Sequence, residues 1–221
     1  MSKPKRSVEK PETKANAAIA SANLRPLEPT DWPLVEHLFG SNGACGGCWC
    51  MHWRVERGGK AWDNLKGDPN RRSLKALVET GEVYAILASL GDLPVGWCSF
   101  GPATSFPRLK NSRALARPRS DGVWSVICFY IPSKYRRLGL ATRLLGAARE
   151  RAFALGASEV EGFPVDPQSP EIPVPAAFAW TGVTAMFDAA GFRPVPRPDR
   201  ARVIYASAQP TGAGEARGVA Q

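Results

Sequence analysis

Hydrophobic residues follow two different periods within residues 123–155. The first part, VWSVICFYI, is apolar and rich in aromatic and β-branched residues, which predicts a buried strand. In the second part, leucines and alanines recur every three or four residues from Leu140 to Leu155, which predicts a helix with one buried face. With Ser133 as the N-cap of that helix, Gly139 would lie in its early turns. The pattern therefore predicts a strand, a turn and an amphipathic helix in direct succession.

The remaining apolar segments predict a domain in which strands and helices are mixed. The other predicted strands cover residues 23–27, 83–90, 93–100, 159–165 and 201–206, with one more after Phe192. The other predicted helices cover residues 32–39, 70–80 and 180–190. The resulting order, β-α-α-β-β-β-α-β-α-β-β, places the chain in the α/β (α+β) class.

Composition sets the limits of this domain. A chain of 221 residues with 44% hydrophobic residues can form one globular domain with a substantial core, which we expect over residues 22–208. Residues 1–21 are basic and lack aromatics, and residues 209–221 are rich in Gly and Ala, so we expect a disordered tail and a flexible tail. We find no apolar run of membrane-spanning length and no secretory signal, and we expect a cytoplasmic protein with reduced cysteines and no membrane partner.

The basic turn between the predicted strand and helix is suited to hold an anion. The first N–H groups of a helix have no partner within the helix, and the helix dipole is positive at that end. Arg136 and Arg137 add positive charge, and Gly139 lets a ligand approach the backbone closely. The turn therefore predicts a site for a phosphate or pyrophosphate group.

The residues of this turn resemble a known signature. Arg136-Arg137-Leu138-Gly139-Leu140-Ala141 is similar to the Q/R-x-x-G-x-G/A signature of the GNAT superfamily, the acyl-CoA-dependent N-acyltransferases, and it stands in the expected strand and helix context. The late segment from Phe187 to Phe192, FDAAGF, resembles the family motif Y-x-x-x-G-F. Cys48-Trp49-Cys50-Met51 and Gly96-Trp97-Cys98 resemble segments of a bacterial subset of the family.

The resemblance implies a fold, a co-substrate and a reaction. It implies a mixed sheet of six to seven strands that splays between strands 4 and 5, flanked by about four helices. It also implies the direct transfer of an acetyl group from acetyl-CoA to an amine, either a small molecule or a peptide, and it allows a homodimer. The cofactor-binding residues it implies are Phe129, Tyr130, Ile131, Arg136, Arg137, Leu138, Gly139, Leu140, Ala141 and Thr142.

The acid and base of such a reaction are less defined. Many family members carry a Tyr that protonates the CoA thiolate where this chain has Phe187, which has no proton to give. Another group must act, or the thiolate leaves with the help of solvent. We name Tyr130 as the candidate acid, because its hydroxyl is nearest in sequence to the expected thioester. Glu161 is the candidate base if it points into the splay, although a strand Glu and a strand Tyr commonly have only structural roles.

A cluster of cysteines and one histidine lies in an irregular, Trp-rich segment. Cys45, Cys48, Cys50 and His52 offer ligand types that zinc accepts, but the C-x-x-C-x-C-x-H spacing is unusual and a second, distant pair is missing. We therefore expect no metal. In the fold that the resemblance implies, this segment covers the acceptor pocket, so that the candidate acceptor-binding residues are Trp49, Cys50, His52 and Trp53.

The net charge of +9 leaves more than one class of function open. A basic protein can bind nucleic acid, but the sequence contains no nucleic-acid motif with interleaved aromatics, and we expect no nucleic-acid partner. Phosphates of CoA would account for part of the charge. Three hypotheses remain: an acetyltransferase, an acyl-CoA-binding module with little turnover, and a nucleic-acid-associated protein.

Overall fold

A central sheet of seven strands organises the protein in the computed structural model, which describes residues 11–56, 58–167, 174–175, 178–197 and 202–209. The strand order is β1-β2-β3-β4-β5-β7-β6, and all neighbours are antiparallel except β4 and β5. This confirms the mixed sheet and the α+β class. The strands are β1 (Asn23–Pro26), β2 (Tyr84–Leu90), β3 (Leu93–Pro102), β4 (Val123–Tyr130), β5 (Glu159–Gly162), β6 (Arg193–Pro194) and β7 (Tyr205–Ala208).

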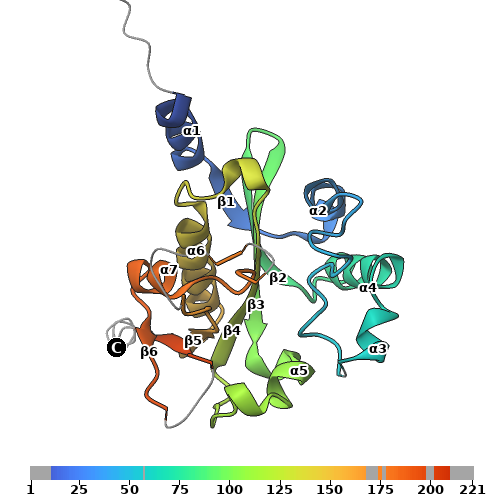
Figure 1. Cartoon of the computed structure of the whole chain (residues 1–221), viewed down its shortest axis with the longest axis vertical. Helices are drawn as coiled ribbons and strands as arrows, with labels where there is room; N and C mark the ends of the chain where they lie inside the picture. Colours follow the sequence, from blue (N-terminus) through green and yellow to red (C-terminus); the bar gives the residue numbers. More distant parts are fainter. Residues whose placement is uncertain (1–10, 57, 168–173, 176–177, 198–201, 210–221) are drawn as a thin grey trace, which may run out of the picture.

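Helices cover both faces of the sheet. Helices α6 and α7 lie on one side of it, and α2 to α5 lie on the other (Figure 1). The helices are α1 (Pro11–Ala20), α2 (Trp32–Phe39), α3 (Lys60–Asp63), α4 (Asp68–Glu79), α5 (Pro107–Lys110), α6 (Leu140–Ala154) and α7 (Thr184–Ala189). Four short 3-10 turns are η1 (Pro29–Asp31), η2 (Ala103–Ser105), η3 (Arg113–Leu115) and η4 (Ser133–Tyr135). None of the helices in the described ranges is long and apolar enough to cross a membrane.

Each face of the sheet packs against its own core. Toward α2 and α4, buried aromatics such as Phe39, Trp97 and Phe106 form one cluster. Toward α6 and α7, Leu144 and Phe187 belong to a second cluster. A fully buried side chain of this size contributes about 1.5–3 kcal/mol, so these two layers hold the sheet in place between the helices.

Strands β4 and β5 pair over only half of β4. The parallel register joins Val123–Val126 to Glu159–Gly162, and from Ile127 onward β4 has no β5 partner. The two strands therefore separate where the sequence resemblance implies a splay. Beyond that point the amide of Phe129 donates to the carbonyl of Trp180 at 2.7 Å, so the segment before α7 contacts the edge of β4 that β5 leaves unpaired.

Residues 11–20 form helix α1, although they fall within the disordered tail that was expected over residues 1–21. Helix α1 begins at Pro11, and Ile19 near its end is buried. The guanidinium of Arg143 on α6 donates to the backbone carbonyls of Ile19 and Ala22, which ties the end of α1 to the domain. This contact could not be predicted from the sequence, because it depends on a single buried isoleucine and on an arginine that is distant in sequence. Residues 1–10 and most of the expected C-terminal tail, residues 210–221, lie outside the described residues.

Candidate functional site

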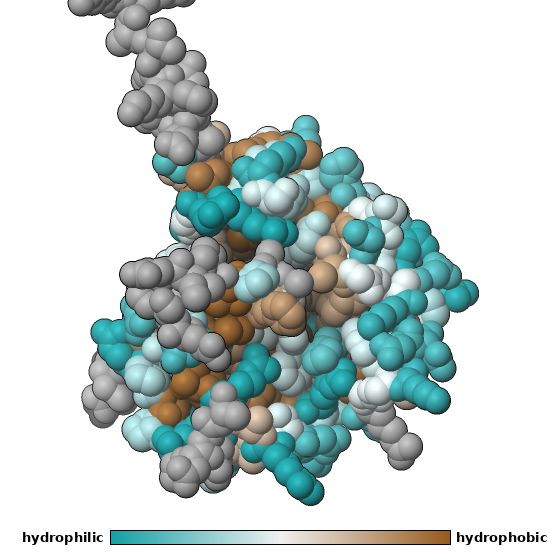
Figure 2. Space-filling view, viewed as in Figure 1, coloured by the Kyte–Doolittle hydropathy of each residue, from teal (hydrophilic) through white to brown (hydrophobic). Residues whose placement is uncertain are grey.

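One large cavity, about 790 Å³ in volume, opens beside the free part of β4. Figure 2 shows apolar residues exposed in a band down one face of the molecule, with hydrophilic residues on both sides. The cavity walls come from β4, the turn before α6, the loop before α3 and the segment before α7. The cavity therefore joins the basic turn to the Cys-rich segment, two parts of the chain that are far apart in sequence.

The basic end of the cavity is the start of α6. The helix begins at Leu140 and not near Ser133, because Gly139 adopts a left-handed conformation (φ 79°) that ends the preceding turn and acts as the N-cap. Glycine has no side chain that could cap the helix, and the first-turn N–H groups of Leu140, Ala141 and Thr142 have no partner within the helix. A Cβ at Gly139 would meet no atom within 4 Å, which leaves open space in front of these amides.

The arginines of the turn have separate tasks. Arg136 donates from Nε to the carbonyl of Ile131 at 2.7 Å, which holds the turn against the end of β4. Arg137 is exposed and has a positive φ of 60°, an unusual value for a residue with a side chain. Both arginines line the cavity, and together with the helix N-terminus they make this end favourable for an anion.

The free edge of β4 forms the floor of the cavity. Phe129, Tyr130 and Ile131 all line it, and the ring of Tyr130 packs edge-on against Phe39 at 5.5 Å. The Phe129 amide, which was expected to bind the cofactor, is already bonded to the Trp180 carbonyl. Gly182, two residues after Trp180, has a positive φ of 86°, and a Cβ there would lie 2.3 Å from a Met186 methyl carbon, so a glycine suits the packing of this segment against α7.

Glu161 does not line the cavity and has another role. Its carboxylate is fully buried and is held by Arg119 Nε at 2.6 Å, Arg117 Nε at 3.1 Å and the Ser125 hydroxyl at 2.9 Å. Arg117 also pairs with Glu159. The expectation that Glu161 points into the splay is therefore not met, because two arginines from the loop before β4 neutralise it inside the fold.

Phe187 also lies away from the cavity. Its ring is fully buried and packs on Phe192 and Tyr205, with ring centroids 5.2 and 5.8 Å away. Gly162 leaves room for it, since a Cβ there would come within 2.3 Å of the ring. A tyrosine at this position would therefore need a place for its hydroxyl in a packed core.

Four of the five cysteines line the cavity: Cys45, Cys48, Cys50 and Cys128. The Cys50 sulfur accepts a hydrogen bond from Trp97 Nε1 at 3.1 Å. Burial raises the pKa of the Cys48 thiol to about 11, and a hydrogen bond with Cys50 together with burial raises the pKa of Cys128 well above its usual value. Within the described ranges, no group of three or more His, Cys, Asp or Glu side chains is arranged to hold a metal ion.

His52 is held as a neutral ring at the opposite side of the cavity. Arg108 Nη1 lies 3.1 Å from His52 Nδ1 and 3.2 Å from the His52 carbonyl oxygen. Since a guanidinium can only donate, Nδ1 accepts and the ring proton sits on Nε2. Burial and the positive charges of Arg108, Arg202 and Lys66 lower the pKa of His52 to about 4.

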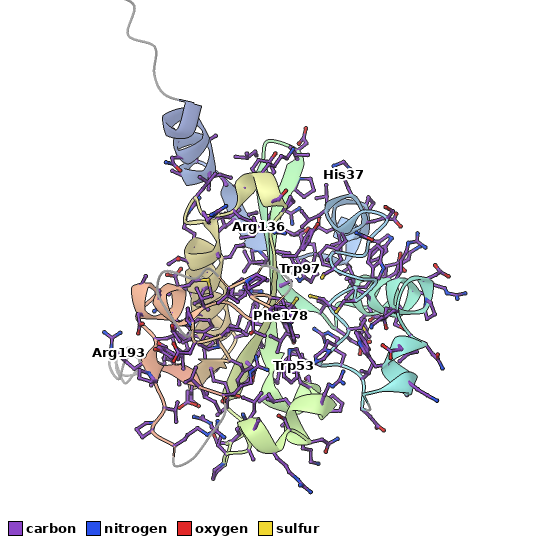
Figure 3. All side chains as sticks on the ribbon, in the orientation of Figure 1. His37, Trp53, Trp97, Arg136, Phe178 and Arg193 are labelled. Atoms are coloured by element: carbon purple, nitrogen blue, oxygen red, sulfur yellow. The ribbon has the colours of Figure 1, made fainter. Side chains whose placement is uncertain are left out.

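The cavity does not include every residue expected at the site. Trp49 and Trp53 are buried behind it: Trp49 stacks on Trp32, and Trp53 donates from Nε1 to the Ile127 carbonyl at 3.1 Å (Figure 3 labels Trp53). Leu138 packs toward the α6 core. The sequence prediction missed several lining residues that no site motif marks, in or near the short helices α3 and α7: Trp62, Lys66, Trp180, Val183 and Met186. The other expected residues, Cys50, His52 and those of β4 and the turn, do line it.

Comparisons with known proteins agree with this architecture. A family model described as the acetyltransferase (GNAT) family matches residues 50–171, just over half of the chain. No curated protein sequence matches the chain.

Solved structures are similar at low sequence identity. AAC(6')-Ib in complex with ribostamycin and coenzyme A is 19% identical, with a TM-score of 0.50 over 86% of this chain and 94% of that one. Ribosomal-protein-alanine N-acetyltransferase from Brucella melitensis is 14% identical, with a TM-score of 0.49 over 85% of this chain and 99% of that one. PaiA N-acetyltransferase from Thermoplasma acidophilum, in complex with coenzyme A, is 13% identical, with a TM-score of 0.48 over 86% and 99%. The sequence match over residues 50–171 shows that the chain belongs to the acetyltransferase (GNAT) family.

Proposed function

We propose that this protein is an N-acetyltransferase that moves an acetyl group from acetyl-CoA directly to an amine in a ternary complex. The observation that carries the proposal is that one cavity joins the uncapped start of α6 to the free edge of β4 and to an aromatic wall. A cavity of about 790 Å³ has the size of known ligand sites. A direct transfer needs donor and acceptor in one space, which such a continuous cavity provides.

The basic end fits the phosphates of the donor. The amides of Leu140, Ala141 and Thr142 and the side chains of Arg136 and Arg137 would hold the pyrophosphate. Each favourable charge at a helix N-terminus contributes about 0.3–1 kcal/mol where it is exposed. The free space in front of Gly139 leaves room for the phosphate oxygens.

The reaction needs two proton transfers, one from the attacking amine and one to the CoA thiolate, and few groups in the cavity can take part in them. When bound, acetyl-CoA supplies an activated acetyl thioester. The attacking amine must be neutral, and neither Glu161, locked by two arginines, nor Nδ1 of His52, bonded to Arg108, is free to take its proton. We assign the proton removal to solvent in the cavity and the protonation of the CoA thiolate to the Tyr130 hydroxyl.

A second candidate is an acyl-CoA-binding module with little turnover. One observation favours it: the Phe129 amide, a donor suited to polarise a thioester carbonyl, is bonded to the Trp180 carbonyl. Transfer would then require the Trp180 segment to move or another amide to take this role. By contrast, Arg117 and Arg119 of the basic loop bind carboxylates within the fold, so these two guanidinium groups are not offered to nucleic acid.

Thiol release from acetyl-CoA separates these candidates. The assay would follow free CoA spectrophotometrically across a panel of amines, with a thermal unfolding experiment at millimolar acetyl-CoA beside it. The transferase predicts both stabilisation by acetyl-CoA and amine-dependent CoA release. Stabilisation without release would favour the binding module, and no stabilisation would exclude both.

A further inference from the structure

One end of the cavity combines aromatic walls with positive charge. His52, Trp62, Lys66 and Trp180 line this end, which we call the acceptor end. The His52 ring lies edge-on to Trp62 and Trp180, with centroids 5.4 and 5.0 Å away. Trp53 lies below, 5.8 Å from Trp180. These flat aromatic walls favour an acceptor with a flat or branched apolar group.

Cations surround these rings. The Arg108 guanidinium lies over Trp62 at 5.8 Å, and that of Arg202 lies over Trp53 at 6.0 Å. Arg202 is held by the Phe163 carbonyl and the Thr181 hydroxyl, each at 3.1 Å. For the residues that the structure describes, no ion pair with a carboxylate is found for either arginine. Among the described residues, the positive charges of these two arginines are therefore not balanced by a paired carboxylate.

Lys66 and His52 line the cavity wall at this end. Lys66 pairs with Asp63 at 2.7 Å, but both side chains are about half exposed, so this pair is weak and can exchange for a ligand. The neutral His52 ring carries its proton on Nε2 and is a hydrogen-bond donor there. Both groups suit an anionic oxygen ligand.

We propose that the amine acceptor carries a carboxylate beside an aromatic or branched apolar side chain, as an α-amino acid does, with Lys66 and His52 binding the carboxylate. This inference rests on the proposed acetyltransferase function. The same cations act on the reacting amine, since nearby positive charge disfavours an ammonium and favours the neutral, nucleophilic form. The acceptor end thereby favours deprotonation of the amine, which neither Glu159 nor Glu161 can carry out because each is paired with an arginine.

A matched pair of amines tests the proposal. L-Phenylalanine and 2-phenylethylamine differ only in the carboxylate, and spermidine serves as a polycation. The proposal predicts that kcat/KM for L-phenylalanine exceeds that for 2-phenylethylamine by about tenfold or more, as one charged hydrogen bond allows, and that spermidine is the poorest acceptor. Lys66→Met should reduce the ratio of the first two by about tenfold, mostly through KM for L-phenylalanine.

The control variant is Lys60→Met, which removes an exposed charge from the same short helical region but not from the cavity. The comparison of the two variants cancels the different basicities of the amines. The inference is overturned if the wild type acetylates L-phenylalanine no better than 2-phenylethylamine, or if the ratio of the two kcat/KM values is the same in both variants. In either case the acetylation itself still upholds the transferase. No turnover with any amine overturns the transferase and this inference with it.

Discussion

Replacement of Glu161 by Gln separates a structural role from a catalytic one. The carboxylate is fully buried and bound to Arg117, Arg119 and the Ser125 hydroxyl. Gln has nearly the same shape but no charge, so Glu161→Gln leaves two arginines, only 13% and 14% exposed, without their shared counter-charge. We expect this change to destabilise the fold and to leave the chemistry of the folded protein intact.

The magnitude follows from the burial. Removal of one partner from a buried ion pair costs about 3–5 kcal/mol, and we expect the lower end here because Ser125 and Arg119 can still donate to the amide oxygen. For a domain of this size each kcal/mol lowers Tm by about 2–4 °C, so Tm should fall by roughly 6–12 °C. Glu159→Gln is the matched control: its partly exposed carboxylate also pairs with Arg117, and we expect a loss of about 1 kcal/mol or less.

The assay combines thermal unfolding with acetyl-transfer rates measured well below Tm. A general base would show the opposite pattern to a structural carboxylate, because its loss lowers kcat by about a hundredfold or more and has little effect on stability. A Glu161→Gln protein with unchanged Tm and a kcat reduced by that factor would refute our reading of the ion-pair network.

Three further predictions concern individual groups. The His52 imidazole should titrate near pH 4 by NMR. Because its folded pKa lies below the ordinary 6.5, the free energy of unfolding should fall as the pH decreases from about 6.5 to 4. A titration midpoint above pH 6 would contradict the Arg108 contact. At pH 7 a maleimide should modify the exposed Cys45 before Cys48, whose pKa burial raises to about 11, and CoA should protect both; labelling of Cys48 first would be inconsistent with this geometry. Arg143→Ala should increase proteolysis and amide exchange in α1, at a cost of about 1–3 kcal/mol, and unchanged exchange there would show that its bonds to Ile19 and Ala22 are dispensable.

Periodicity predicted the elements that pack against the sheet. The buried face of α6 includes Leu144 and Ala148, and the apolar run of β4 is a strand as expected. The start of α6 was predicted too early, because Ser133 resembles an N-cap in sequence while the left-handed Gly139 sets the boundary in space. Helix α7 likewise begins at Thr184 and not at residue 180.

The candidate site was predictable only where a local motif marks it. The turn residues Arg136 to Ala141 carry a signature, whereas Trp62, Lys66 and Trp180 stand in segments that carry no such motif. The structural role of Glu161 could not be predicted either, because no local motif marks it. Its partners Arg117 and Arg119 lie over 40 residues away in a loop, and only the tertiary structure brings them to β5.

Binding of acetyl-CoA at the start of α6 is the central claim, and calorimetric titration of the cofactor tests it most directly. Gly139→Trp would fill the open space before the first-turn amides, and Gly139→Ala is the control for backbone strain, since both replace a glycine with φ 79°. We predict micromolar-range binding in the wild type, a modest loss in Gly139→Ala and at least a hundredfold loss in Gly139→Trp with the fold retained. Equal affinity in the Trp and Ala variants would contradict the assignment of the pyrophosphate to this turn.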